Sequence, residues 1–466
     1  MMQFGSIDFL LFFIVVLIGT VVIEHFFSQR VKEYFLLIGS YFFYGYWDWR
    51  FCFLLLFVTT VSYCAAKAAK SRLAYITGII VPLLALGIFK YSYFFLSSVM
   101  AIAGYETAFF DIMLPVGISF YTFQALSYVI DVRRGKITVE NDFIKLSLYI
   151  SFFPQLVAGP IIRASDFLPQ LREKRRVSMD SIKCGIQIFA FGLFKKTVIA
   201  DHLSVLVDDV YNSPAVFHWA TILLALVSYS LQIYFDFSGY SDMAVGCAKC
   251  LGYDFNRNFN MPYISQSVTE FWHRWHISLS SWLKEYLYIP LGGNRGGRMR
   301  QYLNLFLTML ISGLWHGANW TFVFWGGLNG VALCVDKWLS GRKNQGKRFL
   351  VRIVCTMLTF MFITFTFIFF RADSFKTAGM VIWGILTFQD GIRHPYTWSF
   401  IAIAVLGIST AFAILKARKQ NLLRADGYYP MLNLDSVGGL TGFFVAVGLI
   451  LCLAYTGENP FIYFLF

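Results

Sequence analysis

The chain has 466 residues, of which 58% are hydrophobic and 14% are charged, and its formal net charge is +13. Its mean hydropathy is +0.61. Soluble proteins carry about 25% charged residues, so this composition excludes an ordinary soluble chain and indicates an integral membrane protein. The basic residues cluster in short loops between apolar runs, which is the positive-inside pattern. We therefore expect them to border anionic lipid, and we exclude nucleic acid as a partner.

Apolar stretches recur along the whole chain, without a long polar insert. The candidate spans are 7–27, 33–47, 51–66, 73–89, 113–130, 144–160, 183–200, 217–236, 302–319, 321–336, 349–370, 398–416 and 437–456. Because a span needs about 20 apolar residues, several of these are too short to cross unaided. The sequence predicts a single all-α membrane domain over residues 1–466, with about 11 crossings and additional re-entrant or peripheral helices. The first span is expected to be retained, and the basic loops place both termini outside.

Two segments depart from simple crossing. The segment 144–160 has basic loops on both sides and contains Pro154 and Gly159-Pro160, which favours a broken helix that enters the membrane and returns. The region 253–300 carries many arginines around an apolar stretch, Trp282–Leu291, and is typical of a re-entrant element on the cytoplasmic side. Of the eight cysteines, Cys247 and Cys250 form a CxxC motif without a second pair, so we expect free thiols and no metal site.

Two histidines lie in apolar, tryptophan-rich surroundings. His276 belongs to Trp275-His-Ile-Ser, and His316 to Gly313-Leu-Trp-His-Gly317. An ionisable side chain at membrane depth indicates a functional site. Gly313 and Gly317 are four residues apart, so they share a helix face and let a neighbouring backbone come close. We interpret His316 as a catalytic base, with a structural clamp between helices as the alternative.

The surroundings of His276 leave more than one interpretation open. Its segment has the composition of an interfacial amphipathic helix, and His273 is the weaker catalytic candidate. Asp236 lies in an apolar stretch, where it either orients an imidazole or forms a cap or ion pair with Arg257 or Arg274. Glu270 is expected to pair with Arg274 locally. The residues expected to bind substrate are Trp275, Trp315, Asn319, Ser278, Arg274 and Asp236.

The segment 457–466 ends in Phe461-Ile-Tyr463-Phe-Leu-Phe466, which has no charged side chain. Terminal segments are normally polar and loose. Because this one would expose a large apolar surface to water, we expect it to dock. It is either an aromatic anchor at the outer interface or the means by which the Tyr463 hydroxyl reaches a buried site.

Motifs spread over residues 35–375 resemble the membrane-bound O-acyltransferase (MBOAT) superfamily. They are most similar to the branch that O-acetylates extracytoplasmic polysaccharides such as alginate and peptidoglycan. The motifs are Leu114-Pro-Val-Gly-Ile-Ser-Phe-Tyr, Phe153-Pro-Gln-Leu-Val-Ala-Gly-Pro160, Asp236-Phe-Ser-Gly-Tyr-Ser-Asp242, Asn258-Phe-Asn-Met-Pro-Tyr263, Trp275-His-Ile-Ser-Leu-Ser280, Tyr288-Ile-Pro-Leu-Gly-Gly293, Gly313-Leu-Trp-His-Gly317 and Phe370-Arg-Ala372.

This resemblance implies helices around a central tunnel, with His316 as the essential histidine and His276 as its partner. It implies acetyl-CoA as the donor, no tightly bound cofactor, a bacterial cytoplasmic membrane location and a separate extracytoplasmic esterase-like partner of the SGNH type. The chain departs from the branch at His273, where arginine is usual, and at Lys284-Glu285, where arginine and aspartate are usual.

The tail also resembles the terminal motif of the small partner protein used in teichoic-acid D-alanylation, in which a tyrosine between aromatic residues is thought to carry the acyl group. By that analogy, Tyr463 is an acyl carrier. Two alternatives stay open: a D-alanyl transferase of the teichoic-acid type, and a glycan transporter or channel in which the histidines relay protons. The inverted repeats typical of transporters are not evident in the sequence.

Overall fold

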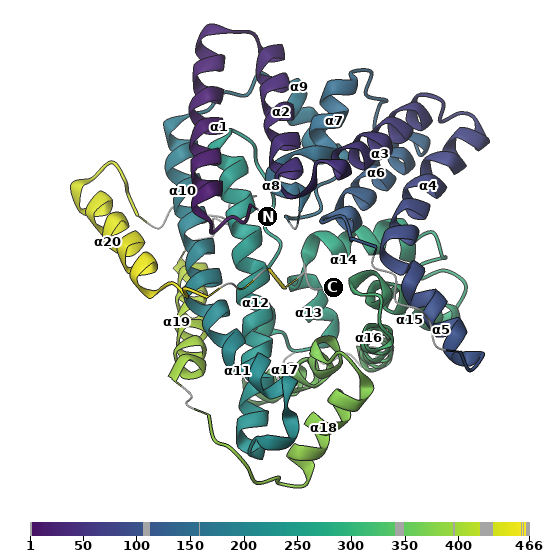
Figure 1. Ribbon diagram of the computed structural model, residues 1–466, viewed down its shortest axis with the longest axis vertical. Helices are drawn as coiled ribbons and strands as arrows, with labels where there is room; N and C mark the ends of the chain where they lie inside the picture. The colour runs from purple at the N-terminus through teal and green to yellow at the C-terminus, as the bar shows by residue number, and fades with distance from the viewer. Residues whose placement is uncertain are drawn as a thin grey trace. The chain divides into compact units, whose positions relative to one another are not determined.

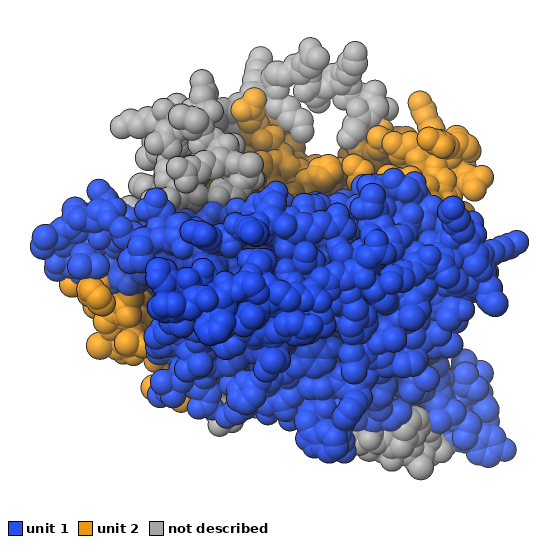
Figure 2. All heavy atoms as spheres, turned by 90° about the horizontal axis from the view of Figure 1, so that it is seen from above, with its two compact units in different colours: residues 1–191, 240–256, 429–443 blue, residues 192–239, 257–428, 444–466 orange. Residues whose placement is uncertain are grey.

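The computed structural model describes residues 2–105, 112–157, 159–340, 349–394, 397–419, 432–457, 459 and 461–462. Within these residues the chain is helical throughout, apart from connecting loops and one isolated bridge between Phe217 and Ile392 (Figure 1). It divides into two compact units, coloured in Figure 2: unit 1, Met1–Phe191 with Tyr240–Asn256 and Tyr429–Phe443, and unit 2, Gly192–Gly239 with Arg257–Tyr428 and Phe444–Phe466. The single folding domain expected from the sequence stays a prediction.

Unit 1 consists of the N-terminal helices, the end of one long helix from later in the sequence, and the first part of α20 (Val437–Leu453). Its helices are α1 (Ile7–Phe26), α2 (Gln29–Asp48), α3 (Arg50–Lys67), α4 (Arg72–Leu86), η1 (Gly87–Tyr91), α5 (Ser92–Ile102), α6 (Ile118–Arg133), α7 (Phe143–Ser151), α8 (Phe153–Leu156), α9 (Ala164–Arg172) and most of α10 (Met179–Leu193).

The helix break predicted within 144–160 is present. Helix α7 ends at Ser151, Phe152 leaves the helical conformation with ψ of 112°, and α8 begins at Phe153. The side chain of Gln155 donates a hydrogen bond to the Tyr149 carbonyl at 2.6 Å, which satisfies one of the backbone groups that the break exposes. The break is therefore a stable feature of the fold, stabilised by the side chain next to the proline.

Unit 2 contains the remaining helices. They are η2 (Phe194–Ala200), α11 (Asp201–Asn212), η3 (Pro214–Val216), most of α12 (Trp219–Cys250), η4 (Pro262–Ile264), α13 (Val268–Arg274), α14 (Ile277–Leu283), η5 (Lys284–Tyr288), α15 (Arg298–His316), α16 (Trp320–Ser340), α17 (Phe349–Arg371), α18 (Phe375–Leu386), α19 (Thr397–Lys419) and the second part of α20 (Val437–Leu453).

Among the described residues, five helices are long and apolar enough to cross a membrane: Ile7–Phe26, Arg50–Lys67, Arg72–Ile102, Trp219–Cys250 and Leu350–Arg371. The chain is thus a multi-pass membrane protein, and the larger number of crossings expected from the sequence stays a prediction. Two predicted spans are longer than expected: 73–89 continues through the π-helical turn η1 into α5, and 217–236 continues to Cys250. The span 217–236 continues because the polar residues of the Asp236–Asp242 motif are buried within the helix and do not end it.

Helices α15 and α16 form a hairpin whose backbones approach closely at two glycines. A Cβ atom on Gly313 would lie 3.0 Å from the Cα of Gly326, and one on Gly326 would lie 3.1 Å from the Cα of Gly313. The close approach predicted from Gly313 is therefore present, with Gly326 as its counterpart. The prediction that Gly317 shares this helix face is wrong, because α15 ends at His316 and Gly317 is its C-cap, in an extended conformation. The hairpin holds the last turn of α15 against the first turns of α16.

We predict that Gly326→Ala lowers the free energy of unfolding by about 1–3 kcal/mol, because the added methyl group meets backbone atoms that cannot move independently. The matched control is Gly327→Ala, where the new Cβ would lie 3.7 Å from Leu310, an ordinary contact. The two variants are purified in the same detergent, and the midpoint of thermal unfolding is measured for each. Equal midpoints for the two variants would contradict the close approach.

Candidate active site

His316 is the last residue of α15, and aromatic rings enclose it. Its side chain is buried, with 3% exposed. The imidazole lies edge-on to Trp325 of α16 at 5.2 Å, to Phe370 of α17 at 5.3 Å and to the neighbouring Trp315 at 5.0 Å between ring centroids. Three helices thus fix the ring and shield it from bulk water, which suits a base that acts on a substrate brought to it.

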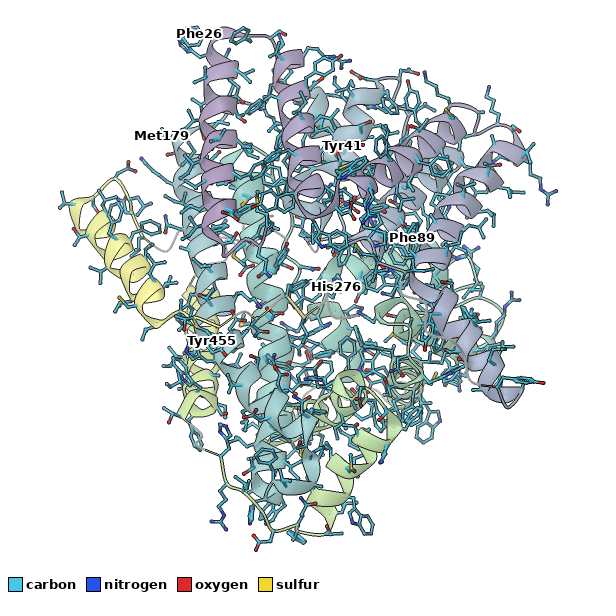
Figure 3. All side chains as sticks on the ribbon, in the orientation of Figure 1. Phe26, Tyr41, Phe89, Met179, His276 and Tyr455 are labelled. Atoms are coloured by element: carbon cyan, nitrogen blue, oxygen red, sulfur yellow. The ribbon has the colours of Figure 1, made fainter. Side chains whose placement is uncertain are left out.

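His276 lies at the junction of α13 and α14 (Figure 3). Its backbone is left-handed, with φ of 43°, a conformation that costs about 1–2 kcal/mol for a residue with a Cβ. Strain of this size is tolerated where the surroundings hold a side chain in a particular place. Here Nδ1 is 3.2 Å from the Oδ1 atom of Asn258, whose backbone carbonyl also accepts from the Ile277 N–H at 2.8 Å.

The protonation state of His276 follows from this environment. The backbone N–H and hydroxyl of Ser278 both donate to Oδ1 of Asn258, at 3.1 and 2.9 Å, so this atom is the amide oxygen and an acceptor. Nδ1 of His276 therefore carries its hydrogen, and in the neutral ring the lone pair is on Nε2. His276 lies outside the five helices long enough to span, and burial lowers its pKa to about 3.

The two histidines, predicted from separate motifs, lie in one aromatic cluster. The ring of His276 lies 6.3 Å from that of Trp315, which in turn contacts His316. On another side, His276 is edge-on to Phe237 of α12 at 4.6 Å. Trp275, expected at the site, is buried in the same cluster and stacks on Phe271 at 5.3 Å.

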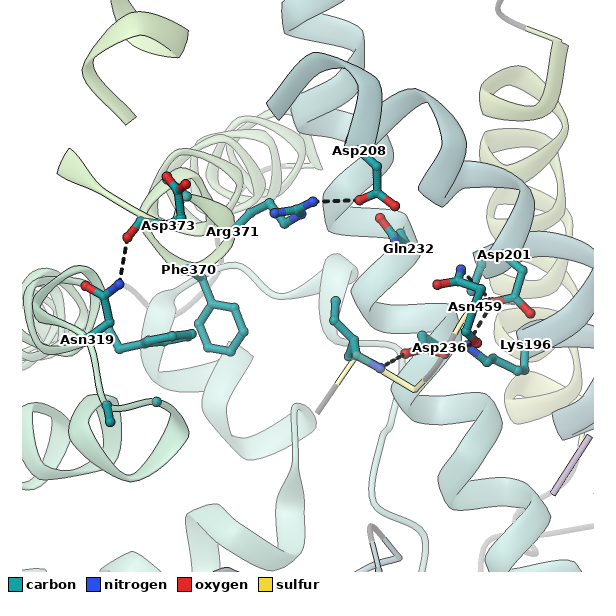
Figure 4. A pocket seen from close by; sticks show the side chains of 16 residues that line it. Lys196, Asp201, Asp208, Gln232, Asp236, Asn319, Phe370, Arg371, Asp373 and Asn459 are labelled. Carbon is teal, nitrogen blue, oxygen red and sulfur yellow. Dashed lines mark hydrogen bonds and ion pairs between the residues drawn. The ribbon is translucent and has the colours of Figure 1, made fainter. Parts of the chain in front are cut away.

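A cavity of about 400 Å³ with several charged residues in its lining lies beside this cluster (Figure 4). Phe370, which contacts His316, forms part of its wall. The other lining residues are Lys196, Ala200, Asp201, Asp208, Gln232, Asp236, Gly317, Ala318, Asn319, Phe322, Arg371, Ala372, Asp373, Asn459 and Ile462. The predicted residue Asn319 is among them, and its side chain donates to the Asp373 carbonyl at 2.7 Å.

Asp236 contacts different groups from those expected. Its Oδ1 atom is 2.7 Å from Nζ of Lys196, which also lies 2.8 Å from Asp201, and its Oδ2 atom accepts the backbone N–H of Ile462 at 2.8 Å. The expectation that Asp236 orients an imidazole, or pairs with Arg257 or Arg274, is therefore corrected. The reason is that Asp236 is adjacent to η2, which supplies Lys196, whereas Asn258 holds His276.

A second cavity, of about 380 Å³, lies elsewhere in unit 2. Its lining residues are Thr269, Trp272, His273, Ile277, Leu279, Ser280, Ser281, Leu283, Lys284, Tyr288, Asn294, Gln301, Leu305, Thr308, Met309, Ser312, Leu333 and Lys337. Ser312 is one helical turn before His316 on α15. The walls of this second cavity are mostly apolar and include two lysines. The first cavity, in contrast, lies beyond the end of α15, where Gly317 lines it.

Three further residues of the predicted site are Arg274, Ser278 and Tyr463, and their substrate roles stay predictions. Arg274 pairs with Glu270 at 2.9 Å, as expected, and Ser278 binds Asn258, so both support the segment around His276. Tyr463 lies outside the described residues. Sequence reasoning missed Asn258 and Lys196 as functional candidates: Asn258 opens a motif that resembles the family, and Lys196 is a basic residue in an apolar run.

Comparisons with known proteins identify a family for this chain. Residues 136–368, which include both histidines, match the MBOAT, membrane-bound O-acyltransferase family. The chain is 36% identical to a probable alginate O-acetylase AlgI of Pseudomonas putida over 496 aligned positions that cover 100% of both proteins. It is 36% identical to a peptidoglycan O-acetyltransferase of Helicobacter pylori, over 75% of this chain and 73% of that protein. A teichoic acid D-alanyltransferase of Bacillus subtilis is 28% identical over 56% of this chain and 69% of that protein.

We predict that the His276 ring stays neutral, with hydrogen on Nδ1, from about pH 8 to about pH 5, because its pKa is lowered by burial. Nitrogen-15 NMR of histidine-labelled protein measures this, and His276→Gln assigns the signal. In Asn258→Ala the signal should shift toward the other tautomer. A titration midpoint near the unperturbed value of about 6.5 would contradict the prediction.

Proposed function

This chain belongs to the membrane-bound O-acyltransferase family, and we propose that it passes an acetyl group from a cytoplasmic donor across the membrane for O-acetylation of an extracytoplasmic polysaccharide. The observation that carries the proposal is the enclosed His316. Its neighbours on the chain line two cavities: Gly317 lines the first and Ser312, one helical turn earlier, lines the second. The relatives that match most of the chain are named for acetyl transfer to alginate or peptidoglycan, and we propose an acceptor of this class.

The two alternatives have less support. The D-alanyltransferase relative aligns with a smaller part of the chain and at lower identity than the acetyltransferases. A transporter or channel does not require a histidine fixed by three helices, and the family is one of acyltransferases. A protein of this kind would work in the bacterial cytoplasmic membrane, and about 11 crossings remain our expectation for its topology.

The donor is proposed to be acetyl-CoA, which approaches the second cavity. That cavity carries Lys284 and Lys337, whose ammonium groups suit phosphates, and its apolar walls suit the thioester arm. The charged coenzyme does not cross a bilayer, so only the acetyl group passes on. Ser312 lies in the wall of this cavity and is one turn from His316 along α15, which supports entry of the thioester end of the donor here.

The proposed chemistry is acyl transfer to a phenol. His316 accepts the proton of the Tyr463 hydroxyl, the phenolate oxygen attacks the thioester carbonyl, and the C–S bond breaks with the proton returned to the thiolate of the coenzyme. The resulting aryl ester keeps a good leaving group, because the pKa of a phenol is about 10. Onward transfer to a sugar hydroxyl is therefore favourable, and a separate esterase-like protein of the SGNH type is the proposed partner for that step.

His276 has a narrower role than the sequence suggested. A partner histidine of this kind can either orient the donor or stabilise the oxyanion. The hydrogen of the neutral ring is on Nδ1 and is donated to Asn258. Nε2 therefore has no hydrogen, so it accepts hydrogen bonds and does not donate one to an oxyanion. We propose that His276 positions the donor and the aromatic wall beside His316.

We predict that His316→Ala lowers acetyl transfer by at least about a hundredfold, because loss of a general base costs two to four orders of magnitude. The assay is transfer of labelled acetyl from acetyl-CoA by purified protein in lipid nanodiscs. His25→Ala, a change at an exposed histidine of α1, is the control and should transfer normally. Full activity in His316→Ala would remove the catalytic role of His316.

A further inference from the structure

We propose that Lys196, Asp201 and Asp236, here called the docking triad, form a binding site for the backbone of the segment that precedes Tyr463. This inference rests on the proposed carrier role of Tyr463 and names the residues that position it. The triad is built on adjacent elements of unit 2: Lys196 on the π-helix η2, Asp201 at the start of α11, and Asp236 on α12.

The contacts between triad and tail involve the tail's main chain and one carboxamide (Figure 4). The Ile462 N–H donates to Asp236 at 2.8 Å, and Nζ of Lys196 donates to the Asn459 carbonyl at 3.3 Å. The Asn459 side chain donates to Asp201 at 3.0 Å and to Ser204 at 2.8 Å. Both ends of the segment 459–462 are therefore bound.

The charges of the triad explain why it accepts such a segment. One ammonium group lies between two buried carboxylates, so the fully ionised triad has an excess of one negative charge. Buried charge is costly unless other groups hydrogen-bond to it. A peptide that presents an N–H and a carboxamide supplies donors without adding a second full charge. The site thus fits a peptide segment, and this chain provides one.

The apolar side chains of the segment connect the triad to the two histidines. Phe461 and Ile462 are buried, with 1% and 4% exposed. The ring of Phe461 lies 5.7 Å from that of Phe237, which contacts His276. Ile462 lines the same cavity as Phe370, the residue that contacts His316. Ile462, the residue before Tyr463 in the sequence, therefore lies in the wall of that cavity.

A second contact precedes the triad along the tail. The Tyr455 N–H donates to the Thr197 carbonyl at 2.9 Å, and Thr197 follows Lys196 on η2. The ring of Tyr455 also lies edge-on to His202 at 5.3 Å. A π-helical turn shifts carbonyl groups out of the regular α-helical pattern and is common at functional sites. The segment is thus bound along η2 before it reaches Asp236.

The test measures whether the tail leaves the site when the triad is disrupted. In a background with the eight native cysteines replaced, Ile462→Cys provides a buried thiol at the docked position. Its reaction with a membrane-impermeant maleimide should be slow. Asp236→Ala and Asn459→Ala should each speed labelling by about tenfold or more, because each removes hydrogen bonds that involve a charged group.

The matched control is Asp435→Asn, which removes an exposed ion pair with Lys183 in unit 1 and should leave the labelling rate unchanged. Asn459→Ala changes only the tail. If Asp236→Ala does not fold, Asn459→Ala therefore still tests whether the tail leaves the docking triad. A positioning role further predicts that Asp236→Ala and Asn459→Ala both lower kcat for acetyl transfer and leave KM for acetyl-CoA unchanged.

The docking site is wrong if the thiol introduced by Ile462→Cys stays protected in folded Asn459→Ala protein. Its positioning role is wrong if labelling speeds up while kcat stays normal. The proposed function is tested by a different measurement, acetyl transfer by His316→Ala. The two results can be distinguished because labelling of the introduced thiol does not depend on acetyl transfer.

Discussion

The site depends on the close backbone approach of α15 and α16 at Gly313 and Gly326. Side chains at these positions would hold the two helices apart. Their contact brings Trp325 of α16 against His316 at the end of α15, and Phe370 of α17 closes the enclosure. The imidazole is thereby fixed between helix ends, where no flexible loop is needed to orient it. A fixed, shielded base suits a reaction in which the substrate comes to the enzyme from another compartment.

Around this enclosure, buried polar groups have separate tasks. Asn258 sets the tautomer of His276, and the docking triad binds the tail. The two arrangements meet at Phe237, whose ring contacts both His276 and Phe461. The tail is therefore connected to His276 through one aromatic ring, Phe237. Each buried charge of the triad has partners of opposite charge or polar donors, as a low-dielectric site requires.

Many features of the fold and of the site could be predicted from the sequence. The others could not, and in each case there is a physical reason. His276 and His316 stand out because histidine is rare in such apolar stretches, and the break after Ser151 follows from Pro154. The partner of Asp236 was missed because Lys196 is distant in sequence and reads as a lysine at the end of a span. The length of α12 was missed because serines and aspartates normally end an apolar stretch, whereas here they are buried and the helix continues. The αL backbone of His276 has no sequence signal at all.

The most direct test of the central claim is detection of the acyl intermediate itself. Purified protein is incubated with labelled acetyl-CoA, quenched in acid and digested, and its C-terminal peptide is analysed by mass spectrometry. The account predicts an acetyl group on Tyr463 that alkali or hydroxylamine removes. This acetyl group should be absent from His316→Ala. Tyr463→Phe, which cannot carry it, should not transfer acetyl to the polymer. Normal polymer acetylation by Tyr463→Phe, with no acetylated tail peptide in the parent protein, would contradict it.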